Sequence, residues 1–206
     1  DDNLFFFTTC GWMMWNWLVT ALATGCTITL YDGSPFHPQP HVLFDLIDQE
    51  SITVFGISAK FLSNAQKEMV NPAKTHRLSS LRCLISTGSP LTEEGFQYVY
   101  EKIKKDVHLV SMTGGTDLIS CFILGNPNLP VYSGELQSAG LGMAVDIWDD
   151  HGNSVKQEKG ELVCTVPFPS CPIGFWNDSG NNSFLDAYFR RFPNTWVHGD
   201  FAEITT

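Results

Sequence analysis

The chain has 206 residues, 43% of them hydrophobic, and carries a formal net charge of −10. This length and apolar content predict one or two folded cores. The acidic balance argues against nucleic acid and anionic membranes as partners, because both favour a basic face. The longest apolar stretch, Trp12 to Gly25, is broken by Asn16 and is too short to cross a bilayer.

The six cysteines favour a reducing compartment, because none belongs to a C-x-x-C pair and four lie in apolar runs, as reduced core thiols do. No signal-peptide pattern opens the sequence. We therefore expect a cytoplasmic protein.

The first 130 residues alternate between strand and helix patterns. Expected strands cover residues 4–8, 27–31, 52–57, 82–86 and 107–111. Expected helices cover residues 12–23, 40–49, 59–69 and 92–103, the last capped by Thr92. Strands separated by helices of this length predict an α/β fold with a mostly parallel sheet. In such sheets ligands gather at the carboxyl ends of the strands.

After about Leu129 the pattern becomes β-rich. Strands are expected at 144–148 and 161–166, joined by the turn-rich stretch 149–153, and then a short helix at 184–192 and a strand at 196–205. The sequence thus predicts two domains, an α/β domain over 1–130 and a β-rich subdomain over 131–206. The second is expected to be a distorted barrel or a small sandwich.

A ligand-binding loop is suggested by Ser-Met-Thr-Gly-Gly-Thr-Asp at 111–117, directly after an apolar run. Two glycines let backbone approach a ligand closely, while Thr116 and Asp117 can hold a metal-bound phosphate. An ordinary turn is the alternative for this composition. For Asp117 alone, the alternative is the N-cap of a helix that begins at Leu118.

Two further segments accompany this loop, namely Ser-Thr-Gly-Ser-Pro-Leu at 86–91 and His-Gly-Asp-Phe at 198–201. Together, in this order and spacing, the three resemble the nucleotide-binding motifs of the adenylate-forming acyl-CoA synthetases. The strings at 10–17, 30–35 and 160–165 extend the resemblance over essentially the whole chain and favour the branch that activates acetoacetate.

The resemblance implies particular roles for the motif residues. Thr116 would contact the α-phosphate of ATP, and Asp117, where the family more often has glutamate, would bind Mg²⁺. Asp200 would accept both ribose hydroxyls, which suits a two-oxygen acceptor. The implied nucleotide-contacting residues are Gly88, Ser89, Pro90, Met112, Thr113, Gly115, Thr116 and Asp200.

The resemblance also implies an acyl pocket lined by Met13, Met14, Thr87 and Gly114. Acetate-activating relatives have tryptophan where Gly114 stands, so a glycine leaves room for a larger acid such as acetoacetate. Thr87 and Thr113 are candidate donors to its 3-keto oxygen. Medium-chain relatives also have glycine here, and the aromatic and methionine stripe at 12–17 also fits plain helix packing.

The expected function is therefore an enzyme that activates acetoacetate with Mg-ATP to acetoacetyl-AMP and transfers the acyl group to CoA. Its partners would be these small molecules, with the oligomeric state left open. The alternatives are a ligase for another short- or medium-chain acid and a non-catalytic nucleotide-binding module. The family's Gly-rich phosphate loop and lysine-bearing C-terminal domain have no counterpart here, so we expect an internal piece of a longer enzyme that is inactive alone.

Overall fold

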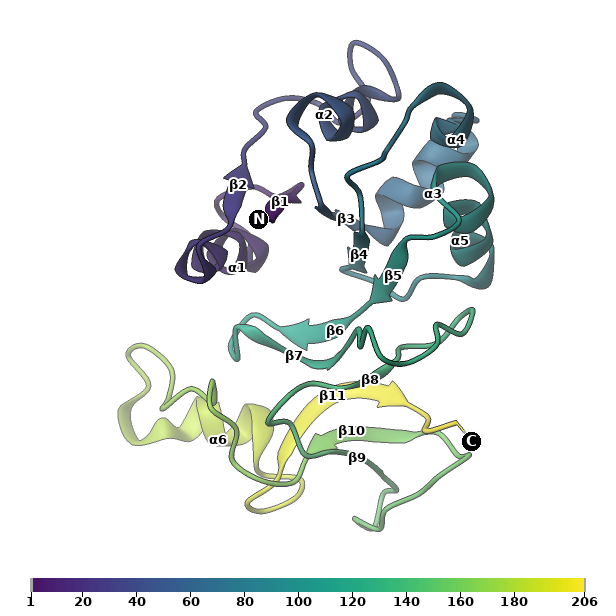
Figure 1. The fold of residues 1–206 in the computed structure, drawn as a ribbon. Coiled ribbons are helices and arrows are strands. Elements are labelled where there is room, and N and C mark those ends of the chain that lie inside the picture. The colour runs from purple at the N-terminus through teal and green to yellow at the C-terminus, as the bar shows by residue number, and fades with distance from the viewer. Residues whose placement is uncertain (1, 206) are drawn as a thin grey trace. The chain divides into compact units, whose positions relative to one another are not determined.

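The computed structural model describes residues 2–205, which fall into two compact units. The first unit comprises the chain up to Thr113 together with Leu124–Ser138. The second unit comprises Gly114–Ile123 and the chain from Ala139 onward. Figure 1 traces both along the chain.

The first unit is built on a five-stranded sheet in the order β2-β1-β3-β4-β5, in which every neighbouring pair is parallel. Its strands are β1 (Asn3–Phe6), β2 (Thr27–Thr29), β3 (Val54–Ser58), β4 (Cys83–Thr87) and β5 (His108–Ser111). The predicted α/β class and parallel sheet are confirmed.

Helices connect these strands as the sequence pattern predicts. They are α1 (Met13–Thr20), η1 (Ala21–Thr24), α2 (Val42–Glu50), α3 (Ala59–Lys67), α4 (Pro72–Thr75), α5 (Glu93–Tyr98) and η2 (Val99–Ile103). Gly25 ends the first pair with a left-handed φ of 80°. Thr92 caps α5 by accepting a hydrogen bond from the Gly95 N–H at 3.3 Å. The helix expected over 92–103 changes into one π-helical turn at η2.

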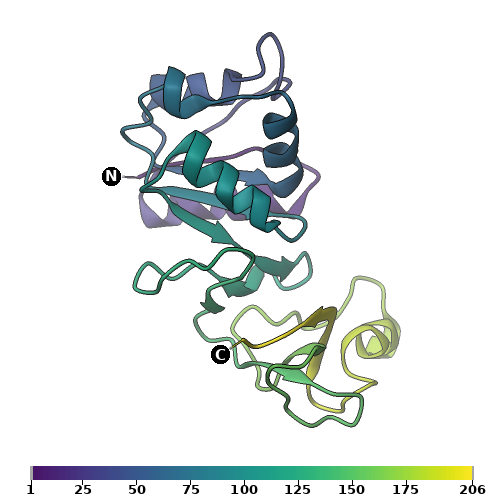
Figure 2. The same ribbon diagram turned by 90° about the vertical axis from the view of Figure 1, so that its right-hand side faces the viewer.

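Different elements cover the two faces of this sheet. Successive strand residues point to opposite faces, so neighbouring residues of β1 pack against different elements. Phe5 belongs to the large core beneath α2, α3 and α5 and stacks on Phe55. The next residue, Phe6, makes edge contacts with Trp12 and Trp17 beside α1. Figure 2 looks onto the first face, with the teal helix α5 in front of the strands.

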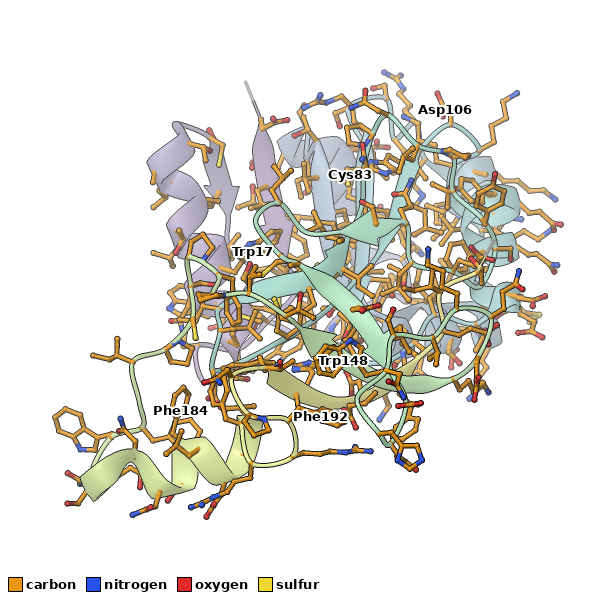
Figure 3. All side chains as sticks on the ribbon, turned by 90° about the horizontal axis from the view of Figure 1, so that it is seen from below. Trp17, Cys83, Asp106, Trp148, Phe184 and Phe192 are labelled. Carbon is orange, nitrogen blue, oxygen red and sulfur yellow. The ribbon has the colours of Figure 1, made fainter. Side chains whose placement is uncertain are left out.

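The second unit contains an antiparallel sheet in the order β11-β10-β9. Its elements are β9 (Val145–Trp148), β10 (Gly160–Cys164), η3 (Ser179–Asn181), α6 (Asn182–Tyr188) and β11 (Trp196–Ala202). The expected helix begins two residues early and ends at Tyr188 rather than at residue 192. Trp148 and Phe192, labelled in Figure 3, meet edge to face at 5.2 Å between ring centroids. The sheet is open, with three strands, rather than a barrel.

The sequence pattern missed a third sheet, formed by β6 (Thr113–Gly115), β7 (Ser120–Leu124) and β8 (Ser138–Ala139). The boundaries between the two units fall inside the strands of this third sheet. The pattern gave no signal for β6 because glycine is depleted in strands and offers no alternation of apolar side chains.

Two expectations about cellular setting bear on the described residues. The six cysteines form no disulfide, and burial raises the pKa of the Cys83 thiol to about 11. Within residues 2–205, none of the helices has the length and apolar character needed to cross a membrane.

Candidate functional site

The first candidate contact is the turn that follows β4. Gly88 lies one residue past the carboxyl end of the strand and has a φ of +87°, which glycine adopts at little cost. Ser89 and Pro90 follow it, and all three residues are exposed. A Cβ atom on Gly88 would lie 3.8 Å from the Trp12 ring, an ordinary contact distance. The turn therefore offers backbone and an aromatic edge to a ligand.

The residue after β5 is tied to the end of β4. The Met112 N–H donates to the Ser86 carbonyl at 3.1 Å. The Thr87 hydroxyl donates to the Met112 carbonyl in a long contact of 3.5 Å. Met112 itself is buried and Thr87 is half-buried. These contacts bring Thr87 and Met112 together within the first unit.

The two methionines of α1 differ in exposure. Met14 is buried and Met13 is half-buried. The burial of Met14, together with the contacts of Phe6 with Trp12 and Trp17, fits helix packing as well as a pocket wall. The role of both methionines in acid recognition stays a prediction.

Thr116 and Asp117 lie in the turn between β6 and β7 in the second unit. The turn covers residues 116–119 and exposes both side chains. No helix begins at Leu118, so the alternative role of Asp117 as a helix N-cap is wrong. The glycines before the turn let two backbone segments approach, which places a threonine and a carboxylate at an exposed hairpin end.

The glycine before this turn has a specific steric reason. A Cβ atom on Gly114 would lie 2.1 Å from the Ser120 carbonyl oxygen and 2.9 Å from the Cys121 Cα. Both obstructing atoms are backbone, so a side chain could enter only if the hairpin moved. Gly114 is therefore required by the pairing of β6 with β7, and its role in acid selection stays a prediction.

Asp117 has a partner that the sequence did not reveal. The Tyr188 hydroxyl donates to Asp117 Oδ2, and the Tyr188 ring stacks on Trp196 with centroids 3.7 Å apart. Burial, and then the adjacent Asp117 carboxylate, raise the pKa of Tyr188 well above its ordinary value. The hydroxyl thus stays protonated at neutral pH and keeps one carboxylate oxygen in place.

Asp200 lies on β11 with its side chain 59% exposed. It follows Gly199, whose φ is +88° and whose N–H donates to Glu161 Oε1 at 2.7 Å. Glu161 is only 3% exposed and pairs with Arg191, from Nη1 to Oε2, at 2.6 Å. The buried Glu161 carboxylate, which pairs with the exposed Arg191, thus holds the β11 backbone directly before Asp200. Glu161 belongs to the Gly-Glu-Leu string at 160–162, which was noted without a role.

The comparisons with known proteins fit this arrangement. Residues 1–168 match the family described as AMP-binding enzyme. The chain belongs to this family. It is 59% identical over 204 residues to an acetoacetyl-coenzyme A synthetase of Rhizobium meliloti (strain 1021), covering 99% of this chain and 31% of that protein. The acetoacetyl-CoA synthetase of Gallus gallus is 52% identical, with the same two coverages.

The fold agrees as well. A solved structure titled acetoacetyl-CoA synthetase from Streptomyces lividans matches the whole chain with a TM-score of 0.94 and 43% identity, which covers 32% of that protein. The chain thus spans about a third of the length of the relatives that it matches. The resemblance to acyl-CoA synthetases seen in the sequence is confirmed. The AMP-binding match ends before Asp200, which lies inside the longer matches to the relatives.

A magnesium ion is implied by this family of AMP-binding enzymes, and its fit can be judged from Asp117. Within the described residues no group of three or more histidine, cysteine, aspartate or glutamate side chains could hold a metal. Mg²⁺ is usually bound by one or two carboxylates plus substrate phosphates, not by a cage of protein ligands. An exposed Asp117 at a hairpin end, oriented by Tyr188, fits that mode of binding.

Proposed function

We propose that the protein containing this chain is an acid–thiol ligase that activates acetoacetate with ATP. It would form acetoacetyl-AMP and pyrophosphate and then transfer the acyl group to CoA, releasing AMP. The observation that carries the proposal is the similarity to acetoacetyl-CoA synthetases along essentially the whole chain. ATP and CoA would be co-substrates, and the cysteine pattern supports a cytoplasmic setting.

The first unit would contribute the adenine contacts. Gly88, Ser89 and Pro90 would line one face of the base with backbone, which their exposure permits. Met112 would support this turn through its hydrogen bond to Ser86. We also propose that residues 1–130 carry the adenine and acyl contacts and that residues 131–206 carry the ribose contact.

The phosphate contacts would come from the hairpin end in the second unit. Thr116 would donate to the α-phosphate, where charge develops as the carboxylate attacks. Asp117 would hold Mg²⁺, which when bound neutralises charge on the phosphate oxygens. Gly115 would let backbone approach the same oxygens, and Thr113, which belongs to the first unit, is a further proposed nucleotide contact.

Asp200 would accept both ribose hydroxyls. Its side chain is 59% exposed, and the buried Glu161 carboxylate accepts a hydrogen bond from the strand backbone at Gly199, directly before it. A carboxylate can accept two hydrogen bonds from neighbouring hydroxyls, one on each oxygen.

The acyl pocket is proposed from Met13, Met14, Thr87 and Gly114, with Thr87 and Thr113 as donors to the keto oxygen. A second candidate function is a ligase for another short- or medium-chain acid. The tight β6–β7 approach is compatible with it, because that approach requires glycine at position 114 whatever the acid. Acid identity must therefore be measured.

The test is acid-dependent exchange of labelled pyrophosphate into ATP by the full-length protein, which isolates the adenylation step. Acetoacetate, acetate, butyrate and hexanoate would be compared at matched concentrations. We expect the highest kcat/KM with acetoacetate. A higher value with butyrate or hexanoate would select the second candidate function, and no exchange with any acid would favour a nucleotide-binding module.

A further inference from the structure

One imidazole in the second unit has no assigned role. His198 lies on β11, two residues before Asp200, and its side chain is 11% exposed. Its ring meets Phe122 edge to face, with centroids 4.8 Å apart. Other residues of β11 are exposed, so the low exposure of the His198 imidazole suggests that it makes a specific contact.

That contact is made by the Nε2 atom. It lies 3.3 Å from the Gly114 carbonyl oxygen on β6 and 3.5 Å from Asp200 Oδ2. Both neighbours are acceptors, so we assign a proton to Nε2, which then donates to the Gly114 carbonyl. Nδ1 is buried and has no hydrogen-bond partner in the described part of the chain, which suits the nitrogen that carries only a lone pair.

The shape of the site is matched to the ring. A Cβ atom on Gly115 would come within 3.1 Å of His198 Cε1, so the imidazole occupies the space that a side chain at position 115 would need. His198 therefore joins β11 to β6 by packing and by one hydrogen bond. Its hydrogen-bond partner Gly114 lies three residues before Asp117, and His198 itself lies two residues before Asp200.

We propose that His198 is a positioning residue that fixes the Asp200 carboxylate against the β6 backbone, so that recognition of the ribose depends on it. The inference rests on the proposed role of Asp200. Without the Nε2–H, the Asp200 carboxylate would lose a polar neighbour 3.5 Å from Oδ2, and its two oxygens would fit the two ribose hydroxyls less well.

The experiment measures affinity for ATP and for 2′-deoxy-ATP by titration calorimetry, with the full-length protein and no acid. His198→Phe keeps an aromatic ring against Phe122 but removes the donor. His198→Gln carries an amide N–H at similar reach. His108→Phe is the matched control, because His108 is another half-buried histidine, bonded to Gln137 in the first unit at 2.8 Å.

The wild type should prefer ATP over 2′-deoxy-ATP. His198→Phe should lower that preference by about three- to tenfold, the range expected for one intramolecular hydrogen bond. His198→Gln should restore most of the preference, and His108→Phe should leave it unchanged. An unchanged preference in His198→Phe, with both affinities falling together, would mean that the ring serves packing alone.

If His198→Phe fails to fold, Gln and Asn at the same position decide the question. The Gln variant should keep the preference and the Asn variant, whose amide is too short to reach, should lose it; equal preferences would overturn the proposal. A wild type that does not distinguish the two nucleotides would also overturn it. Failure of acetoacetate-dependent exchange with the ATP preference intact would reject only the proposed acid.

Discussion

In the first unit the candidate adenine contacts are backbone at the end of β4, whereas in the second unit the candidate metal and ribose contacts are carboxylates. Gly88, Ser89 and Pro90 are exposed in a turn shaped by one left-handed glycine. Asp117 is held by Tyr188, and the strand backbone directly before Asp200 is held by Glu161.

This difference teaches where single substitutions act. A contact made by backbone tolerates most changes of neighbouring side chains, so only the conformation of the turn matters. A carboxylate held by a buried partner can be disturbed from a distance, as at Glu161, which is 39 positions before Asp200 in sequence. The second unit should therefore be the more sensitive of the two.

The largest effect is expected from a pair of glycine substitutions, one in each unit, whose local losses of stability are compared. Gly114→Ala should destabilise the β6–β7 hairpin by about 1–3 kcal/mol or more, because the new Cβ meets backbone at 2.1 Å. Gly88→Ala should cost about 1 kcal/mol, since it faces only the left-handed φ. Hydrogen exchange at the amides of residues 113–124 and 83–88 measures both. Equal local losses would contradict the steric argument.

A smaller effect should separate the two members of the Asp117–Tyr188 contact. Asp117→Asn should raise the Mg²⁺ concentration for half-maximal pyrophosphate exchange the most. Tyr188→Phe should raise it by about tenfold, as loss of an outer-sphere partner often does. Tyr132→Phe, at an exposed tyrosine of the first unit, is the control. A wild-type Mg²⁺ response in Asp117→Asn would remove this residue from the metal.

The smallest effect concerns the first unit at alkaline pH. Burial raises the pKa of Tyr98 from 10.0 to about 12, and its hydroxyl donates to the Val70 carbonyl at 2.9 Å. The neutral form is favoured in the folded state, so this contribution is fully present below pH 10 and is lost between pH 10 and 12. Burial also raises the pKa of the Cys83 thiol to about 11. Its contribution to the free energy of unfolding therefore also falls as the pH rises, from about pH 9.

The check is the urea midpoint of unfolding from pH 8 to pH 11.5. Tyr98→Phe should have a shallower fall above pH 10 than the wild type, whereas the exposed Tyr132→Phe should follow the wild-type curve. Parallel curves for all three proteins would show that Tyr98 does not contribute to the alkaline loss.

Local patterns predicted much of the fold. The Thr92 cap, the Gly25 helix stop and the spacing of apolar runs are interactions among near neighbours, so the sequence displays them. The sequence did not predict the β6–β7 hairpin, because its first strand consists of a threonine and two glycines and its pairing depends on the close approach of two backbones.

The resemblance pointed to the motif residues of the candidate site, but not to the residues that hold them in place. Tyr188 is 71 positions from Asp117, and Arg191 is 30 positions from Glu161. No local pattern encodes such pairs, because they form only when the second unit folds. The aromatic and charged stretch at 184–192 is the one available signal, and its pattern predicts only a helix.

The most direct test of the central claim, that this chain carries the ribose-binding carboxylate of an ATP-dependent acid ligase, is the steady-state kinetics of Asp200→Ala in the full-length protein. We expect the KM for ATP to rise about ten- to a hundredfold, as for lost hydrogen bonds to a charged acceptor. The KM for acetoacetate should change little, and Glu203→Ala, at a neighbouring exposed carboxylate, should match the wild type. An unchanged KM for ATP in Asp200→Ala would contradict the account.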